Sequence, residues 1–316
     1  MKNIFNQTFV VLLFLTLSLS AVKAQDALFN VIATGGKVTQ KNIKTGEWLP
    51  LKAGARLSSG DVIRLGKNDF VGLAHSGGKS VELRTEGTFE ADKLAAKIGN
   101  ASNSISKNIA GYVMNEISTV QKSSKNMKML GAVVRQGGNT IELNSPVTTN
   151  LIEPSLNISW NTSPDSKLSI FHLISPDGKT IYMQTTTESS LKLDMKDFRL
   201  QKEAGYKWFV SSGTNNTIIS DSACFYLLSD IKIAAVKDTL ASLNSGITEE
   251  SSLLNSIYTA AFYERNNLNN DALRLYENIN NQPIQVEGFK NKFAGFLINA
   301  GMQTRARIII DETGAN

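Results

Sequence analysis

The hydrophobic periodicity of the chain changes three times, and this change constrains the fold more than any other sequence feature. Over residues 25–91 and again over 145–229, apolar residues alternate in short runs separated by Gly, Pro and Asp, a pattern typical of β-strands joined by tight turns. Over 92–140 and 230–316 they recur every three or four positions, as on an amphipathic helix. The sequence therefore predicts a multidomain protein, mainly β with α.

Residues 1–24 are predicted to be a secretory signal peptide. Lys2 precedes an apolar run, Phe9–Leu19, and small residues stand three and one positions before the predicted cleavage after Ala24. The run is shorter than the roughly 20 apolar residues of a membrane-spanning helix, although an uncleaved short anchor is the alternative. The only cysteine is Cys224, so the cleavage point lacks the cysteine of a lipoprotein. We expect an exported, periplasmic or envelope-associated protein with no transmembrane helix in the mature chain.

Composition excludes several classes of chemistry. With one Cys and two His in 316 residues, the chain forms no internal disulfide and no Cys/His zinc cluster. Its formal net charge of +5 falls to +3 without Lys2 and Lys23, and the basic residues are scattered among acidic ones rather than gathered in a run. Nucleic-acid binding is therefore not expected, and no cofactor or metal is predicted.

Residues 25–91 carry a spaced motif and a hairpin signal. Ser76-Gly77-Gly78 separates two β-like runs, and Gly tolerates the positive φ that hairpin turns require. The order Trp48-x-Pro50-Leu51-x-x-Gly54-x-x-Leu57-x-x-Gly60-Asp61-x-Ile63-Arg64-x-Gly66, followed by Gly78-x-x-Val81-x-Leu83-x-x-x-Gly87, resembles the FecR-like extracytoplasmic domain.

This region is predicted to form a small antiparallel β sandwich or barrel. Asp61 is expected to accept hydrogen bonds from backbone N–H groups of a tight turn. The expected core positions are Val62, Val71, Leu73, Val81 and Leu83.

Residues 92–140 are predicted to be an amphipathic helical connector, broken near Gly99-Asn100. Two interpretations are open. The helix packs on a neighbouring domain, or it lies on a membrane surface, although its polar face is only moderately basic.

Residues 145–229 are predicted to form an immunoglobulin-like β sandwich. Pro176-Asp177-Gly178 separates two β-rich runs as in a hairpin, and the region contains about six or seven such runs. Trp160 with Tyr206 and Trp208 resembles a fibronectin type III fold. These aromatic residues are expected in the core and at a corner of the sandwich, with sugar stacking as the alternative.

Residues 230–316 are predicted to be helical. Helices are expected over Ser251–Glu264, Asn269–Asn278 and about Val286–Ala300, and the first two resemble a tetratricopeptide-type hairpin. One repeat is visible, whereas a solenoid needs about three, so the pair is expected to cap the sandwich or to form half of a partner groove. The candidate interaction surface consists of four aromatic residues, Tyr258, Phe262, Tyr263 and Tyr276.

Catalytic motifs are not apparent. Gly77-Gly78-Lys79-Ser80 ends like a phosphate-binding loop, but a strand rather than a helix follows it. His75 and His172 lack a nucleophile elbow, and Cys224 is expected to be a small buried residue. No pattern marks a catalytic pair of carboxylates.

These observations favour a non-catalytic exported envelope protein that acts as a periplasmic scaffold or adaptor, with other envelope proteins as partners. One alternative is an extracytoplasmic regulatory or sensor module, because the FecR-like resemblance is to regulators of sigma factors. A second alternative is binding of cell-wall glycan, and a third is an enzyme whose acids or His75 meet in a pocket.

Overall fold

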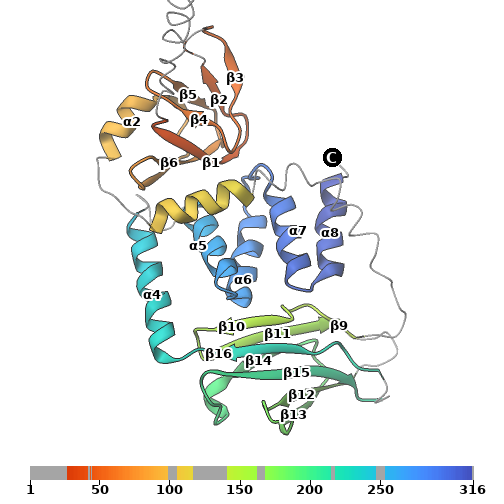
Figure 1. The fold of residues 1–316 in the computed structure, drawn as a ribbon. Coiled ribbons are helices and arrows are strands. Elements are labelled where there is room, and N and C mark those ends of the chain that lie inside the picture. Colours follow the sequence, from red (N-terminus) through yellow and green to blue (C-terminus); the bar gives the residue numbers. More distant parts are fainter. Residues whose placement is uncertain are drawn as a thin grey trace, which may run out of the picture.

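A computed structural model describes residues 27–41, 43, 45–98, 105–116, 141–161, 168–214, 218–246 and 253–314. They form a multidomain, β-rich fold with three parts (Figure 1): an N-terminal β domain, a layer of helices and a β sandwich. The predicted signal peptide and the predicted break near Gly99 lie outside the described residues. Within them, no helix combines the length and apolar character needed to cross a bilayer.

The N-terminal domain consists of two four-stranded antiparallel sheets and a short helix. One sheet has the order β4-β1-β6-β7 and the other β3-β2-β5-β8. The strands are β1 (Phe29–Gly35), β2 (Thr39–Lys41), β3 (Trp48–Pro50), β4 (Arg56–Leu57), β5 (Val62–Leu65), β6 (Phe70–His75), β7 (Ser80–Leu83) and β8 (Gly87–Glu90), followed by α2 (Ala91–Ile98). The hairpin predicted at residues 76–78 joins β6 to β7.

Local chemistry in this domain agrees with the sequence, apart from the face that β5 buries. Asp61 accepts a 2.7 Å hydrogen bond from the Ser58 N–H, and Gly60 beside it has φ of +85°. The expected core residues Val71 and Leu73 are fully buried, but Val62, Val81 and Leu83 are half-buried. On β5 the buried residues are Ile63 and Leu65, because successive side chains of a strand point to opposite faces.

The second β region is a sandwich of a three-stranded and a five-stranded sheet, as predicted. The sheet orders are β14-β11-β9 and β10-β16-β15-β12-β13. Their strands are β9 (Glu142–Leu143), β10 (Thr148–Leu151), β11 (Ser155–Asn161), β12 (Ser169–Ile174), β13 (Thr180–Thr186), β14 (Ser190–Asp194), β15 (Ala204–Ser212) and β16 (Ala223–Leu227). The predicted hairpin at Asp177-Gly178 joins β12 to β13, whereas β10 pairs with β16 in parallel.

The aromatic residues of the sandwich lie in its core and at its corner, as expected. Trp160 and Trp208 are each 1% exposed. The Tyr206 hydroxyl accepts a 2.6 Å hydrogen bond from the Gln201 N–H, five residues upstream, which is the arrangement of a tyrosine corner. These rings are therefore not available for sugar stacking.

The helical layer contains two helix pairs. α4 (Asp230–Ser245) leads from the sandwich to α5 (Leu253–Arg265) and α6 (Asn269–Asn280), which are followed by α7 (Phe289–Asn299) and α8 (Gln303–Gly314). The three predicted helices correspond to α5, α6 and α7, whereas α4 and α8 were not predicted individually. Equivalent residues lie 34 positions apart, with Ala260 matching Ala294 and Ala272 matching Ala306, and about 34 residues is the tetratricopeptide period.

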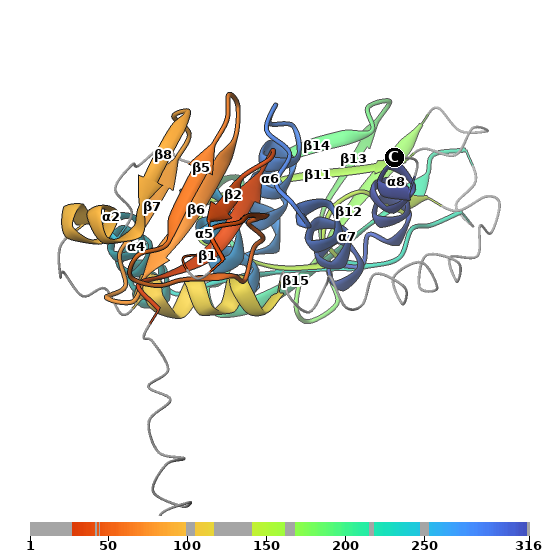
Figure 2. The same ribbon diagram turned by 90° about the horizontal axis from the view of Figure 1, so that it is seen from above.

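Both β domains pack on these helices, and so does the helix formed by residues 105–116, which we call the connector helix (yellow in Figures 1 and 2). A single apolar cluster contains Phe70 of the N-terminal domain, Val113 of the connector helix and Leu254 of α5. The described part of the predicted connector therefore packs on neighbouring elements.

Candidate functional site

The connector helix faces a surface on α5, α6 and the start of α7, and a small cavity lies between them. We call this surface the docking face; its residues are Ile257, Ala261, Tyr276, Val286, Phe289 and Lys292. Tyr112, Val113 and Glu116 line the cavity from the connector helix. The remaining volume is about 20 Å³, room for one or two water molecules, so the connector helix itself fills this part of the molecule.

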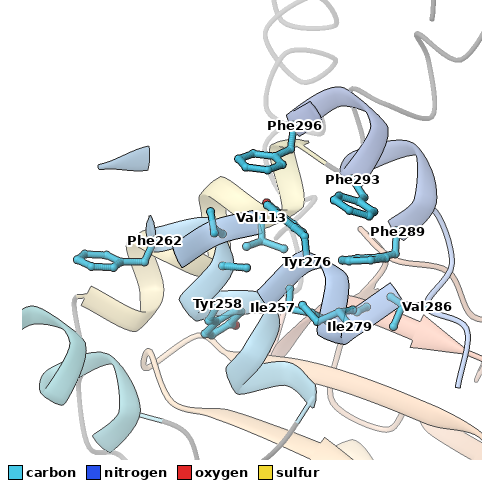
Figure 3. Close-up of a cluster of buried hydrophobic side chains, with 14 of the residues drawn as sticks. Val113, Ile257, Tyr258, Phe262, Tyr276, Ile279, Val286, Phe289, Phe293 and Phe296 are labelled. Atoms are coloured by element: carbon cyan, nitrogen blue, oxygen red, sulfur yellow. The ribbon is translucent and has the colours of Figure 1, made fainter. Parts of the chain in front are cut away.

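The docking face is mostly apolar. Figure 3 shows Val113, Ile257, Tyr276, Val286 and Phe289 among the aromatic side chains of α7. Tyr276 is central, since its ring centre lies 4.8 Å from that of Phe296 and 5.8 Å from those of Phe289 and Phe293. Ring pairs at these separations attract one another, so they contribute to the packing of this face.

Lys292 is a buried cation at one end of this apolar face. It is 7% exposed, and its Nζ lies 2.8 Å from Glu264 and 2.9 Å from Glu116 of the connector helix. Burial alone would lower the pKa of Lys292, but the two carboxylates outweigh it and the pKa is raised. Lys292 is therefore charged, and a charge at this depth needs a carboxylate partner.

Glu264 connects Lys292 to Tyr276. It accepts a 2.5 Å hydrogen bond from the Tyr276 hydroxyl, and burial, together with this carboxylate, raises the pKa of Tyr276 well above its usual value. Tyr276 thus stays neutral, and its hydroxyl donates a hydrogen bond to the Glu264 carboxylate. All three residues belong to α5, α6 and α7, so the core of this polar cluster is internal to the helix pairs.

Tyr112 of the connector helix lies close to two cations. The Lys292 Nζ is 5.7 Å and the Arg265 Cζ is 5.8 Å from its ring centre, within the range of cation–π attraction. Burial raises the pKa of Tyr112 as well. The end of the docking face that receives Glu116 therefore carries two cations, Lys292 and Arg265, and one carboxylate, Glu264.

The structure places the four predicted interaction residues mainly in the interior. Tyr258 is fully buried, with its hydroxyl 3.0 Å from Ser80 Oγ, and Phe262 is 5% exposed. Tyr263 is half-buried against Leu268 and the sandwich. Only Tyr276, itself 3% exposed, belongs to the docking face.

Sequence reasoning missed the charged residues of this site. The available signal was Lys292, which stands between Phe289 and Phe293 on the apolar side of α7, where a cation is out of place unless an acid meets it. Glu264 and Glu116 carry no comparable signal, because each looks like an ordinary solvent-facing acid until the helices are packed.

The other candidate residues lie elsewhere. His172 Nε2 is 2.9 Å from Ser211 Oγ, and its ring stacks on Phe209 at 4.4 Å, all on the outer face of the five-stranded sheet. Cys224 was expected to be buried but is half-buried, because its neighbours Ala223 and Phe225 occupy the inward positions of β16. Burial lowers the pKa of His172 and of His75.

Comparison with models of known protein families gives no match, and comparison with curated proteins gives none either. The FecR-like, fibronectin-like and tetratricopeptide-like resemblances therefore remain predictions.

Proposed function

We propose that this protein is a non-catalytic scaffold or adaptor of the cell envelope that acts by binding other proteins. The observation that carries the proposal is the docking face, which holds an amphipathic helix by apolar contacts and by an ion pair between the buried Lys292 and the partly exposed Glu116. Helix-in-groove contact of this kind is a recurrent mode of protein recognition.

The arrangement of the three parts supports a scaffolding role. The N-terminal domain contacts α5 directly, since the Leu254 N–H donates a 2.7 Å hydrogen bond to Glu82. The sandwich contacts both helix pairs, the first through Asn150 of β10 and the second through Val147, just before β10. A rigid body built from three such parts presents several surfaces at fixed separations, as a scaffold requires.

The N-terminal sequence supports export. If residues 1–24 are a cleaved signal peptide, the mature protein begins at Gln25. N-terminal sequencing of the protein recovered from the envelope tests this directly, and a retained Met1 would contradict it.

The binding role is tested by affinity capture from native envelopes with the mature full-length chain, using an unrelated exported protein of similar charge as control. We expect specific envelope proteins to be enriched and the purified chain to remain in the supernatant when peptidoglycan is sedimented. Cosedimentation with peptidoglycan, without enrichment of any protein, would favour glycan binding instead.

A further inference from the structure

We propose that the connector helix is a displaceable internal ligand, and that the docking face binds a partner helix of the same chemistry in its place. This inference rests on the proposed function and names the partner of that site. The partner is an amphipathic helix with large apolar residues at positions i, i+4 and i+8 and a carboxylate at i+11.

The pattern is taken from the helix that the face already holds. Ile105, Ile109 and Val113 are spaced by four residues, and Glu116 follows three positions later. Ile109 and Val113 are each 4% exposed and Ile105 is half-buried, so the apolar stripe of the helix faces inward. Anchors at such spacing lie on one side of a helix.

Charge determines which helix end lies at Lys292. Lys292 and Arg265 lie near the last described residues of the connector helix, Tyr112 to Glu116. Glu264 pairs with Lys292 there, so the two cations exceed the one carboxylate of the face, and a carboxylate from a partner helix would balance them where a lysine would not. The face therefore selects an acidic residue at one end of an otherwise apolar stripe.

The helix pairs retain their internal polar contacts when the connector helix leaves. Lys292 stays paired with Glu264, whose side chain is 12% exposed, whereas the side chain of Glu116 is 38% exposed. Departure of Glu116 therefore does not leave a buried cation without a partner, which is the costly outcome in a buried ion pair.

Peptide binding to the full-length chain tests the proposal. The probe is a fluorescein-labelled peptide with the sequence of residues 105–116, measured by fluorescence anisotropy. Because the connector helix competes from within the same chain at an effective concentration in the millimolar range, we expect weak binding to the wild type. We expect binding at least tenfold tighter to the variant Val113→Ser, in which the internal competitor is weakened.

Three controls accompany this measurement. Lys107→Ala, on the exposed side of the connector helix, is expected to bind the peptide like the wild type. A peptide with Glu116→Gln is expected to bind the Val113→Ser chain at least fivefold more weakly. Circular dichroism establishes that Val113→Ser is folded; if it is not, the milder variant Ile109→Val takes its place with the same expected direction.

Equal binding to wild type and Val113→Ser, or no binding to either folded chain, would overturn the proposal and identify the connector helix as a permanent part of the core. Indifference to Glu116→Gln would overturn the predicted carboxylate. The first result would remove the docking face as the binding surface of the adaptor, whereas the adaptor role itself fails only if the capture experiment enriches no envelope protein.

Discussion

The two β domains are attached to the same helices by different kinds of contact. The N-terminal domain packs the face of a sheet against α5, and we call this contact the face joint. It is largely apolar: one buried cluster contains Ile32, Phe70 and Ala74 of the sheet together with Leu254 and Tyr258 of α5. The sandwich contacts the helix pairs through the edge of a sheet, and we call this contact the edge joint. It consists largely of directional hydrogen bonds.

The edge joint repeats along the helix pairs. The Asn150 N–H donates to the Asn267 carbonyl at 2.7 Å, and the Val147 N–H donates to the Ala300 carbonyl at 3.0 Å. Asn267 and Gly301, 34 positions apart, both have positive φ, so the same kind of turn meets this edge twice, once at β10 and once at the residue before it. These turns occupy backbone groups of an edge strand that would otherwise be open to further pairing.

The difference indicates what holds each joint. Apolar burial contributes in proportion to area and does not depend on direction, whereas a hydrogen bond contributes about 1 kcal/mol net and needs its geometry. The face joint should therefore be most sensitive to loss of volume, and the edge joint to changes of backbone conformation.

The largest loss of stability is expected for Leu254→Ala. Leu254 is fully buried between α5 and the N-terminal domain, and Leu→Ala at such sites costs about 2–5 kcal/mol. Urea denaturation should show this loss, while Ile231→Ala, at an 83% exposed position of α4, should change stability by about 0.5 kcal/mol or less. Equal effects of the two substitutions would contradict the face joint.

The second largest loss of stability is expected for Gly301→Ala. Gly301 has φ of +82°, and a Cβ there would lie 2.6 Å from the Val147 methyl groups. The combined strain and overlap should cost about 1–3 kcal/mol. At the matching turn, Asn267→Gly should change thermal stability little, because Gly adopts positive φ readily; a large loss there would show that the two turns are not equivalent.

A smaller effect is expected for Asn150→Ala. The Asn150 Nδ2 donates to the Asn266 carbonyl at 3.0 Å, and removing this bond should cost about 1 kcal/mol. The control is Asn157→Ala, at an exposed position of β11. If the urea concentration at the unfolding midpoint is the same for both variants as for the wild type, side-chain hydrogen bonds do not contribute to the edge joint.

The smallest expected effect is the change of stability with pH, to which one histidine in each β domain contributes. Burial lowers the pKa of His75 and of His172 below 6.5, so the unfolded chain binds protons more readily than the folded one. Stability is then present above pH 6.5 and decreases as the pH falls below it. His75 Nδ1 also accepts a 3.1 Å hydrogen bond from Gly77, which protonation would remove.

Unfolding free energies measured between pH 7.5 and 5.5 check this prediction. His75→Gln and His172→Gln should each reduce the slope, and an unchanged slope in both variants would show that other groups cause it.

Local features of the fold followed from the sequence. The hairpins at residues 76–78 and 177–178, the Asp61 turn and the burial of Trp160 and Trp208 each depend on residues close together in the chain. Glycine and aspartate tolerate turn conformations, and large aromatic side chains in alternating strands are buried. The buried face of β5 was predicted wrongly because three of its four residues, Val62, Ile63 and Leu65, are apolar, so the sequence does not show which face is buried.

The candidate site could not be derived in this way. Lys292, Glu264 and Glu116 are separated by up to 176 residues, and nothing local to any of them specifies the others. The second helix pair was only half predicted, since α8 (QTRARIIIDETG) mixes charged and apolar residues without a clear stripe.

Periodicity and turn residues act over a few positions, so the order of β and helical regions and most of their strands and helices could be predicted from the sequence, although α4 and α8 could not. The tertiary structure decided which surfaces meet: that a sheet face joins one domain to α5, a strand edge joins the other, and the connector helix covers Lys292. These outcomes depend on burial and charge pairing between distant segments, which become defined only when the chain is packed.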